Sequence, residues 1–118
     1  KFTEWVNMLG VVPVIQALRS KALSIHEETF QSVERKMPDM TDRERTVISK
    51  HMKSIINQML KDPIIYTKEI SGDRKASAKL EEIEQLFGIE EEVDAIRQQE
   101  KEKLHQKRLA RKKELALD

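Results

Sequence analysis

The residues of this chain that could do chemistry are too scattered to form a catalytic centre. His26 and Glu27 begin a helical zinc-protease motif, in which a second histidine four residues after the first lets both imidazoles bind one metal ion. Phe30 stands at that position, so the motif fails. The other two histidines fall in different segments. Glu27 and Glu28 are neighbours and diverge by about 100° around a helix. The sequence therefore predicts neither a metal site nor a carboxylate pair for acid–base catalysis.

The remaining reactive residue types give the same answer. Cysteine is absent, which excludes disulfides, thiolate metal sites and a thiol nucleophile within these 118 residues. The three glycines are too far apart for a dinucleotide-binding loop or a phosphate cradle. No catalytic, cofactor-binding or metal-binding residue is predicted in the chain. The lack of cysteine also fits a reducing compartment, and we expect a cytoplasmic protein.

The C-terminal quarter offers one possible binding function. Between Lys101 and Lys113 lie seven basic residues and one acid, whereas Glu81 to Asp94 holds seven acids and no base. The basic block could contact an RNA backbone, and the residues assigned to that contact are Lys107, Arg108, Arg111 and Lys112. No aromatic residue lies within the block to stack on a base. A solvated or frayed tail, whose charges complement the helix macrodipole, is the simpler alternative, and a membrane-surface helix is a third.

Composition indicates that the functional residues of this chain lie on helices. Hydrophobic residues make up 38% of the chain, charged residues 36% and aromatic residues 4%, which is typical of long helices with wide solvated faces. Glycine and proline occur three times each, too rarely for the many turns of a sheet protein. The net charge of +1 provides no global field that would recruit nucleic acid. No apolar run approaches the roughly 20 residues of a membrane helix, so we expect no membrane partner.

Hydrophobic periodicity divides the chain into segments. Residues 3–37 carry apolar side chains at spacings of three and four, interrupted by Gly10 and Pro13; we expect either a helix that ends near Gly10 and a second that begins near Pro13, or one kinked helix. Thr41 and Glu44 form a capping box that begins the next helix, and Pro63 is expected to stop it. A short helical piece should follow before residue 71. Residues 77–87 form another helix, ended by Gly88.

The predicted fold is all-α: a multihelical dimerisation domain of four to five helices, with one long helix or a kinked helix pair at the N-terminus. Residues 1–12 are assigned to the end of a long linker helix, 13–89 to the helical domain, and 90–118 to a charged helical tail that is partly disordered or solvated. The chain lacks an initiator methionine and opens within an apolar stripe, so we expect a piece of a longer protein. The apolar stripes supply the residues predicted to form the core or a contact with a second copy: Trp5, Ile15, Leu18, Ile55, Ile56, Met59 and Leu60.

Six short motifs occur in order between residues 2 and 89. They are Phe2-x-x-Trp5, Val12-Pro13-Val14-Ile15-x-x-Leu18-Arg19, Glu27-Glu28, Met59-Leu60-x-x-Pro63, Thr67-Lys68-Glu69-Ile70 and Leu86-Phe87-Gly88-Ile89. Together they resemble the C-terminal dimerisation domain of glutamyl-tRNA reductase. The chain departs from that pattern at Lys61-Asp62, where the family often has a histidine.

The resemblance implies a function for a larger parent protein. That family reduces glutamyl-tRNA to glutamate-1-semialdehyde with NADPH, the first step of five-carbon tetrapyrrole and haem biosynthesis. Its nucleophilic cysteine, tRNA-contacting region and NADPH domain precede the dimerisation domain, so the resemblance implies that these residues hold two subunits together and are not themselves catalytic. The implied partners are a second copy of the chain and, for the parent enzyme, glutamyl-tRNA. An independent helical RNA-binding module that uses the face from Lys101 to Lys113 stays open as an alternative, as does a helical adaptor for another protein.

Overall fold

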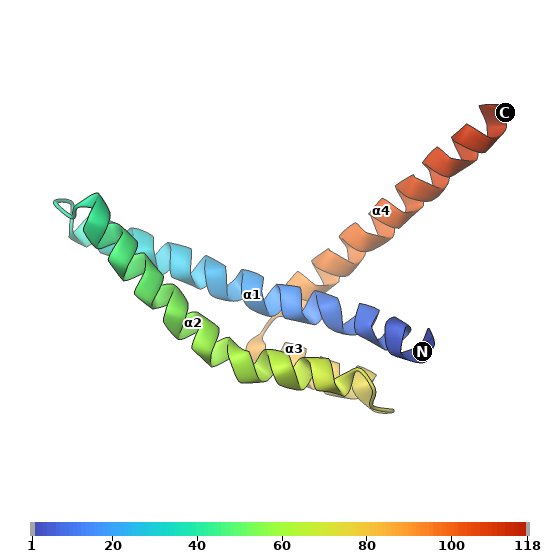
Figure 1. Cartoon of the computed structure of the whole chain (residues 1–118), viewed down its shortest axis with the longest axis horizontal. Coiled ribbons are helices and arrows are strands. Elements are labelled where there is room, and N and C mark those ends of the chain that lie inside the picture. The colour runs from blue at the N-terminus through green and yellow to red at the C-terminus, as the bar shows by residue number, and fades with distance from the viewer. Residues whose placement is uncertain (1, 118) are drawn as a thin grey trace.

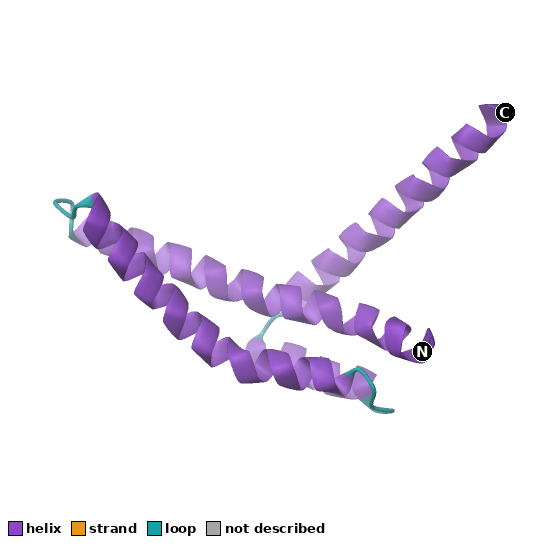
Figure 2. Cartoon of the chain, viewed as in Figure 1, coloured by secondary structure: helices purple, strands orange, loops and turns teal. Residues whose placement is uncertain are grey.

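The computed structural model describes the backbone of residues 2–117 and the side chains of residues 10–116. Within that range the chain forms four helices, which are α1 (Phe2–Lys36), α2 (Asp42–Ile70), α3 (Ala76–Phe87) and α4 (Glu90–Leu117), and no strand (Figures 1 and 2). The all-α prediction is confirmed. The helices α1 and α2 form a long hairpin, α3 packs beside it, and the outer part of α4 leaves the bundle (Figure 1).

Helix α1 passes through Pro13 without interruption. A proline inside a helix costs about 3 kcal/mol, because it lacks the amide proton and its ring crowds the preceding turn. The Pro13 ring is fully buried, as are Val11 and Val14 beside it. Burial of this stretch offsets the local cost. Of the two arrangements that the sequence left open, the structure has the single helix.

Helix α2 begins where the sequence predicts and ends later than predicted. Thr41 is its N-cap, and Thr41 and Glu44 form both bonds of the capping box. The prediction that Pro63 stops this helix is wrong, since α2 continues to Ile70. The Pro63 carbonyl accepts a hydrogen bond from the Thr67 hydroxyl at 2.7 Å. Thr67 is fully buried and Ile70 is 3% exposed, so packing of this last segment maintains the helix past the proline.

Removing the cap tests how much local sequence contributes to this helix. We expect Thr41→Ala to lower the free energy of unfolding by about 1 kcal/mol, because it removes the bond from the Glu44 amide to the Thr41 hydroxyl. Hydrogen bonds from Thr41 lower the pKa of Glu44, so the contribution of the box should be present at neutral pH and fade as the pH falls through that lowered value. Urea unfolding at pH 7 measures the loss. The matched control is Thr46→Ala, whose hydroxyl only bonds the Asp42 carbonyl of its own helix; an equal loss there would contradict the role of the cap.

Gly88 makes the turn between α3 and α4. Its φ of +63° lies in the left-handed region, where residues with a Cβ are strained. The amide of the next residue, Ile89, bonds the Glu84 carbonyl at 2.9 Å, which closes the end of α3. The predicted terminating role of Gly88 is confirmed, and the turn directs Ile89 and Val93 into the core.

One apolar core joins all four helices near the middle of α1. Its buried members come from the first half of α1, the end of α2, the inner face of α3, the turn after α3 and the start of α4: Val11, Val14, Ala17, Leu18, Ile70, Leu80, Ile83, Ile89 and Val93. The radius of gyration is 19.4 Å, against about 13 Å for a compact domain of this length. The core is therefore small for the size of the chain, and much apolar surface remains uncovered.

Candidate dimer interface

An apolar groove of about 250 Å³ lies between α1, α2 and the turn that follows α3. We call it the apolar groove. It is lined by one lysine and eight apolar residues, which are Leu18, Lys21, Ala22, Ile25, Ile56, Met59, Leu60, Phe87 and Ile89. Its floor reaches the core through Leu18 and Ile89, which are buried. Its rim is open, so the groove is a continuation of the core toward solvent.

Large aliphatic side chains stand exposed at this rim. Met59 is 73% exposed, Ile55 is 60% exposed and Ile25 is 53% exposed. Ile55 and Met59 are one helical turn apart and share a face of α2. Single exposed hydrophobic residues are ordinary, but a cluster around an apolar groove is typical of a surface that another molecule covers.

The structure brings together four of the seven residues predicted for the core or the contact with a second copy. Leu18, Ile56, Met59 and Leu60 line the apolar groove. Leu18 is buried, whereas Ile56 and Leu60 are half-buried and Met59 is exposed. The predicted set therefore mixes residues of the core with residues that a second copy could contact.

The other three predicted residues lie outside the groove lining. Ile15 is half-buried against the core. Ile55 is exposed beside the groove. Trp5 falls outside the residues whose side chains the structure describes. Which of the seven residues touch a second copy stays a prediction.

Lys21 is a polar member of the groove that the sequence did not single out. Its Nζ atom donates to the Phe87 carbonyl at 2.7 Å and to the Gly88 carbonyl at 3.1 Å. These are the free carbonyls at the C-terminus of α3, where a positive charge also complements the helix dipole. Lys21 therefore ties the turn after α3 to α1 and keeps Phe87 at the groove. A Cβ on Gly88 would lie 3.1 Å from the same Nζ atom, so a larger residue there would press on this bond.

Ala22, Ile25 and Phe87 also line the groove without having been chosen from the sequence. All three do lie on the predicted apolar stripes, so the signal was present. What the sequence lacked was the pairing of the end of α3 with the middle of α1.

Glu84 on α3 is a carboxyl group that folding buries, with 6% of the residue exposed. Burial is the main cause that raises the pKa of Glu84. The Arg97 charge on α4 opposes this effect, while Asp94, Glu81 and Glu90 add to it. The packing of α3 against α4 therefore carries an electrostatic cost at neutral pH.

Removing that charge should stabilise the fold in a pH-dependent way. Because the folded-state pKa of Glu84 is raised, its unfavourable contribution develops as the pH rises from the unfolded value, about 4.3, through the folded value. We expect Glu84→Gln to raise Tm at pH 7 and to leave it nearly unchanged at pH 3, as followed by circular dichroism. Glu100→Gln, at an exposed position of α4 that is not among the charges acting on Glu84, is the control. The same rise in Tm at both pH values would contradict the assignment.

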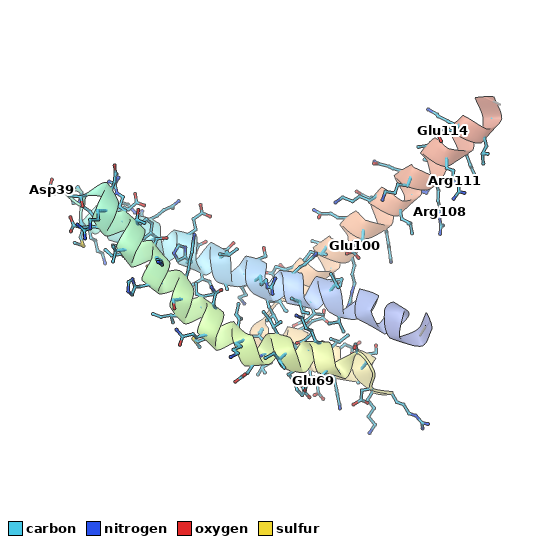
Figure 3. All side chains as sticks on the ribbon, in the orientation of Figure 1. Asp39, Glu69, Glu100, Arg108, Arg111 and Glu114 are labelled. Carbon is cyan, nitrogen blue, oxygen red and sulfur yellow. The ribbon has the colours of Figure 1, made fainter. Side chains whose placement is uncertain are left out.

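The four predicted RNA-contact residues lie on the outer part of α4. Lys107, Arg108, Arg111 and Lys112 are all exposed. Arg108 and Arg111 point into solvent from a helix that has left the bundle, with Glu114 further along (Figure 3). Lys112 lines a pocket that is formed by α4 residues alone. Their RNA contact stays a prediction.

The described residues contain neither a candidate metal site nor a candidate membrane-spanning helix. No group of three or more histidine, cysteine, aspartate or glutamate side chains there could hold a metal ion. None of the described helices combines the length and the apolar character that crossing a membrane requires.

Comparison with known proteins decides the family. The family model for the glutamyl-tRNA(Glu) reductase dimerisation domain matches residues 1–89. The chain belongs to the glutamyl-tRNA reductase family. The dimerisation domain of this family thus contains α1, α2, α3 and the turn that completes the apolar groove. The resemblance deduced from the motifs is confirmed.

Individual glutamyl-tRNA reductases are similar over 89 to 104 residues. The protein named glutamyl-tRNA reductase of Staphylococcus epidermidis is 64% identical over 89 residues, which cover 75% of this chain and 20% of that relative. That of Priestia megaterium is 52% identical over 104 residues, covering 88% of this chain and 23% of that relative. The chain thus spans about a fifth of the length of these curated relatives. No solved structure matches it significantly.

Proposed function

We propose that this chain holds two reductase subunits together by packing the apolar groove of one copy against the same region of another. The observation that supports this most directly is the cluster of exposed Ile25, Ile55 and Met59 around a groove continuous with the core. In a symmetric dimer each copy presents the same patch, so an apolar groove with a raised apolar rim can complement itself. The name of the matched family, a dimerisation domain, supports the same assignment.

The elongated shape of the chain gives a second argument. A small core leaves large hydrophobic residues exposed on every helix, and the resulting stability would be low for a lone copy. A partner that covers the groove contributes the missing burial, at roughly 25 cal/mol per Å² of apolar surface. Obligate dimers typically bury about 2,000 Å² or more, so the contact between copies should extend beyond the groove itself.

The reaction of the larger protein follows as part of the same proposal. Relatives that this chain matches are named glutamyl-tRNA reductase. We assign to the parent protein the NADPH-dependent reduction of glutamyl-tRNA in tetrapyrrole biosynthesis, and to this chain a role in assembly without catalysis. The division at residues 12 and 89 stays a prediction; Ile89 and Val93 of the core lie at and just beyond the second boundary.

Light scattering on the isolated chain tests the proposal. The expected mass is twice that of the 13.8 kDa chain over the micromolar range. Dilution should lower the mass toward that of a monomer and lower the stability of the fold, because the groove would then be exposed to water. A stable, fully helical monomer at all concentrations would refute the assembly role. Reduction of charged tRNA by the chain alone would refute the non-catalytic assignment.

A further inference from the structure

A second groove follows α2 on a different flank, and its lining residues are mostly polar or charged. It measures about 940 Å³ and is lined by basic, hydroxyl and amide side chains, with Phe30 of α1 at its wall. No aspartate or glutamate lines it. We call it the basic groove, and its four cationic residues are Arg45, Lys50, Lys53 and Lys61.

Most of the α2 stretch that lines this groove is free of acids. The whole chain has 22 basic and 21 acidic residues, yet α2 carries no acid between Arg45 and Lys61. Its acids lie in the first turn, directly after Lys61, and near the C-terminal end. Lys50, Lys53 and Lys61 form no ion pair among the described side chains. A row of unneutralised cations over about four helical turns creates a local positive potential that the near-zero net charge conceals.

Arg45 at the end of the row is partly neutralised but keeps spare donors. One of its terminal nitrogens lies 3.3 Å from the Asp42 carboxylate, on the first turn of the helix. Its Nε atom is buried and has no hydrogen-bond partner in the described part of the structure. The Arg45 side chain as a whole is 41% exposed, so a ligand oxygen at this end of the groove could accept a hydrogen bond from its terminal nitrogens.

The other lining residues indicate what kind of polyanion fits. Between the cations stand Thr46, Ser49, Ser54, Asn57 and Gln58. Hydroxyl and amide groups together with arginine and lysine are the side chains that contact phosphate and sugar oxygens in nucleic-acid complexes. The groove offers no row of aromatic residues for base stacking, so it would follow a backbone without reading its sequence.

We propose that the basic groove binds the phosphodiester backbone of RNA. This goes beyond the assembly role and does not rest on it, because the two grooves use different faces of α2. Lys50 and Met59 are nine residues apart, which places them on opposite sides of a helix that turns by about 100° per residue. A dimer formed through the apolar groove leaves the basic groove open. RNA binding here is distinct from the contact predicted for the tail at Lys107 to Lys112.

Charge reversal in the groove tests the proposal on the 118-residue chain. The variant is Lys50→Glu with Lys53→Glu, two exposed positions whose replacement leaves the core intact. The probe is a fluorescently labelled tRNA transcript, and anisotropy is measured over a range of salt concentrations. We expect at least tenfold weaker binding. The slope of log affinity against log salt concentration should also become shallower, by the amount that corresponds to about two lost phosphate contacts. The control Lys107→Glu with Arg111→Glu makes the same change of charge on α4 and should bind within twofold of the parent chain.

The remaining outcomes overturn the proposal in distinguishable ways. If the tail control loses as much affinity as the groove variant, the binding site is α4. If polyglutamate of similar charge binds as tightly as the transcript, the groove accepts an acidic protein. If the groove variant changes mass by light scattering while it loses affinity, the groove belongs to the contact between copies. If the parent chain does not bind the transcript, the proposal fails while the dimer assignment stands.

Discussion

Replacing Met59 with aspartate is expected to convert the dimer into a folded monomer. Met59 is 73% exposed in the single chain, so its loss removes almost nothing from the core. In the proposed dimer the same side chain is covered, and an unpaired carboxylate in an apolar contact is strongly unfavourable. We expect dimer affinity to fall by more than a hundredfold. Light scattering measures the mass, and circular dichroism verifies that the helices remain.

The matched control for this variant is Leu104→Asp. Leu104 is a large apolar side chain like Met59 and is 53% exposed. It lies on the outer part of α4, away from the apolar groove. It introduces the same charge on a helix and should leave the dimer intact. A Met59→Asp chain that keeps the dimer mass would show that the apolar groove is not the contact. Loss of helicity in Met59→Asp at high concentration would instead show that Met59 supports the fold of a single copy, contrary to its exposure.

Truncating Ile89 to alanine should be the most damaging single change to the fold. Ile89 is fully buried and belongs to the apolar core. It also follows the left-handed Gly88, and its amide closes the end of α3. Removing a buried isoleucine to the β-carbon costs about 2–5 kcal/mol, through lost burial and the cavity that remains. That is a large share of the roughly 5–15 kcal/mol that stabilises a typical domain.

Dimerisation would mask part of this loss, so the measurement belongs in a monomeric background. Combining Ile89→Ala with Met59→Asp removes the dependence of stability on protein concentration. Urea unfolding then compares that chain with Met59→Asp alone. Leu109→Ala, on the exposed part of α4, should change the free energy of unfolding by less than about 0.5 kcal/mol. An equally small change for Ile89→Ala would contradict the assigned core.

Local sequence rules predicted the helices well where the decisive interactions are local. The capping box of Thr41 and Glu44 and the terminating Gly88 each involve neighbours within a few residues. The predicted stop at Pro63 was wrong because burial of Thr67 and Ile70 against other helices maintains α2 beyond it. That burial comes from residues distant in the chain, which propensity and periodicity do not describe.

The surfaces could be predicted only in part, for a similar reason. Periodicity placed Leu18 and Met59 in one predicted set, although one is core and the other is exposed, because a stripe does not show how far its neighbours cover it. The bond from Lys21 to the Phe87 carbonyl spans 66 positions and left no pattern in the sequence. The acid-free stretch of α2 was visible in the sequence, but it becomes a groove only because α1 runs beside it.

The outer part of α4 should melt separately from the rest of the molecule. From Gln98 to Ala116 every described side chain is exposed, and this arm extends away from the other helices (Figures 1 and 3). A helix of this length without tertiary contacts is only marginally stable in water, and its helix content falls gradually with temperature. Heating should therefore produce a gradual loss of ellipticity before the main transition, and backbone amides of the arm should exchange with deuterium far ahead of those around Val14. The early loss of ellipticity would measure the helix–coil equilibrium of the arm alone, whereas the packed helices would unfold together in the main transition.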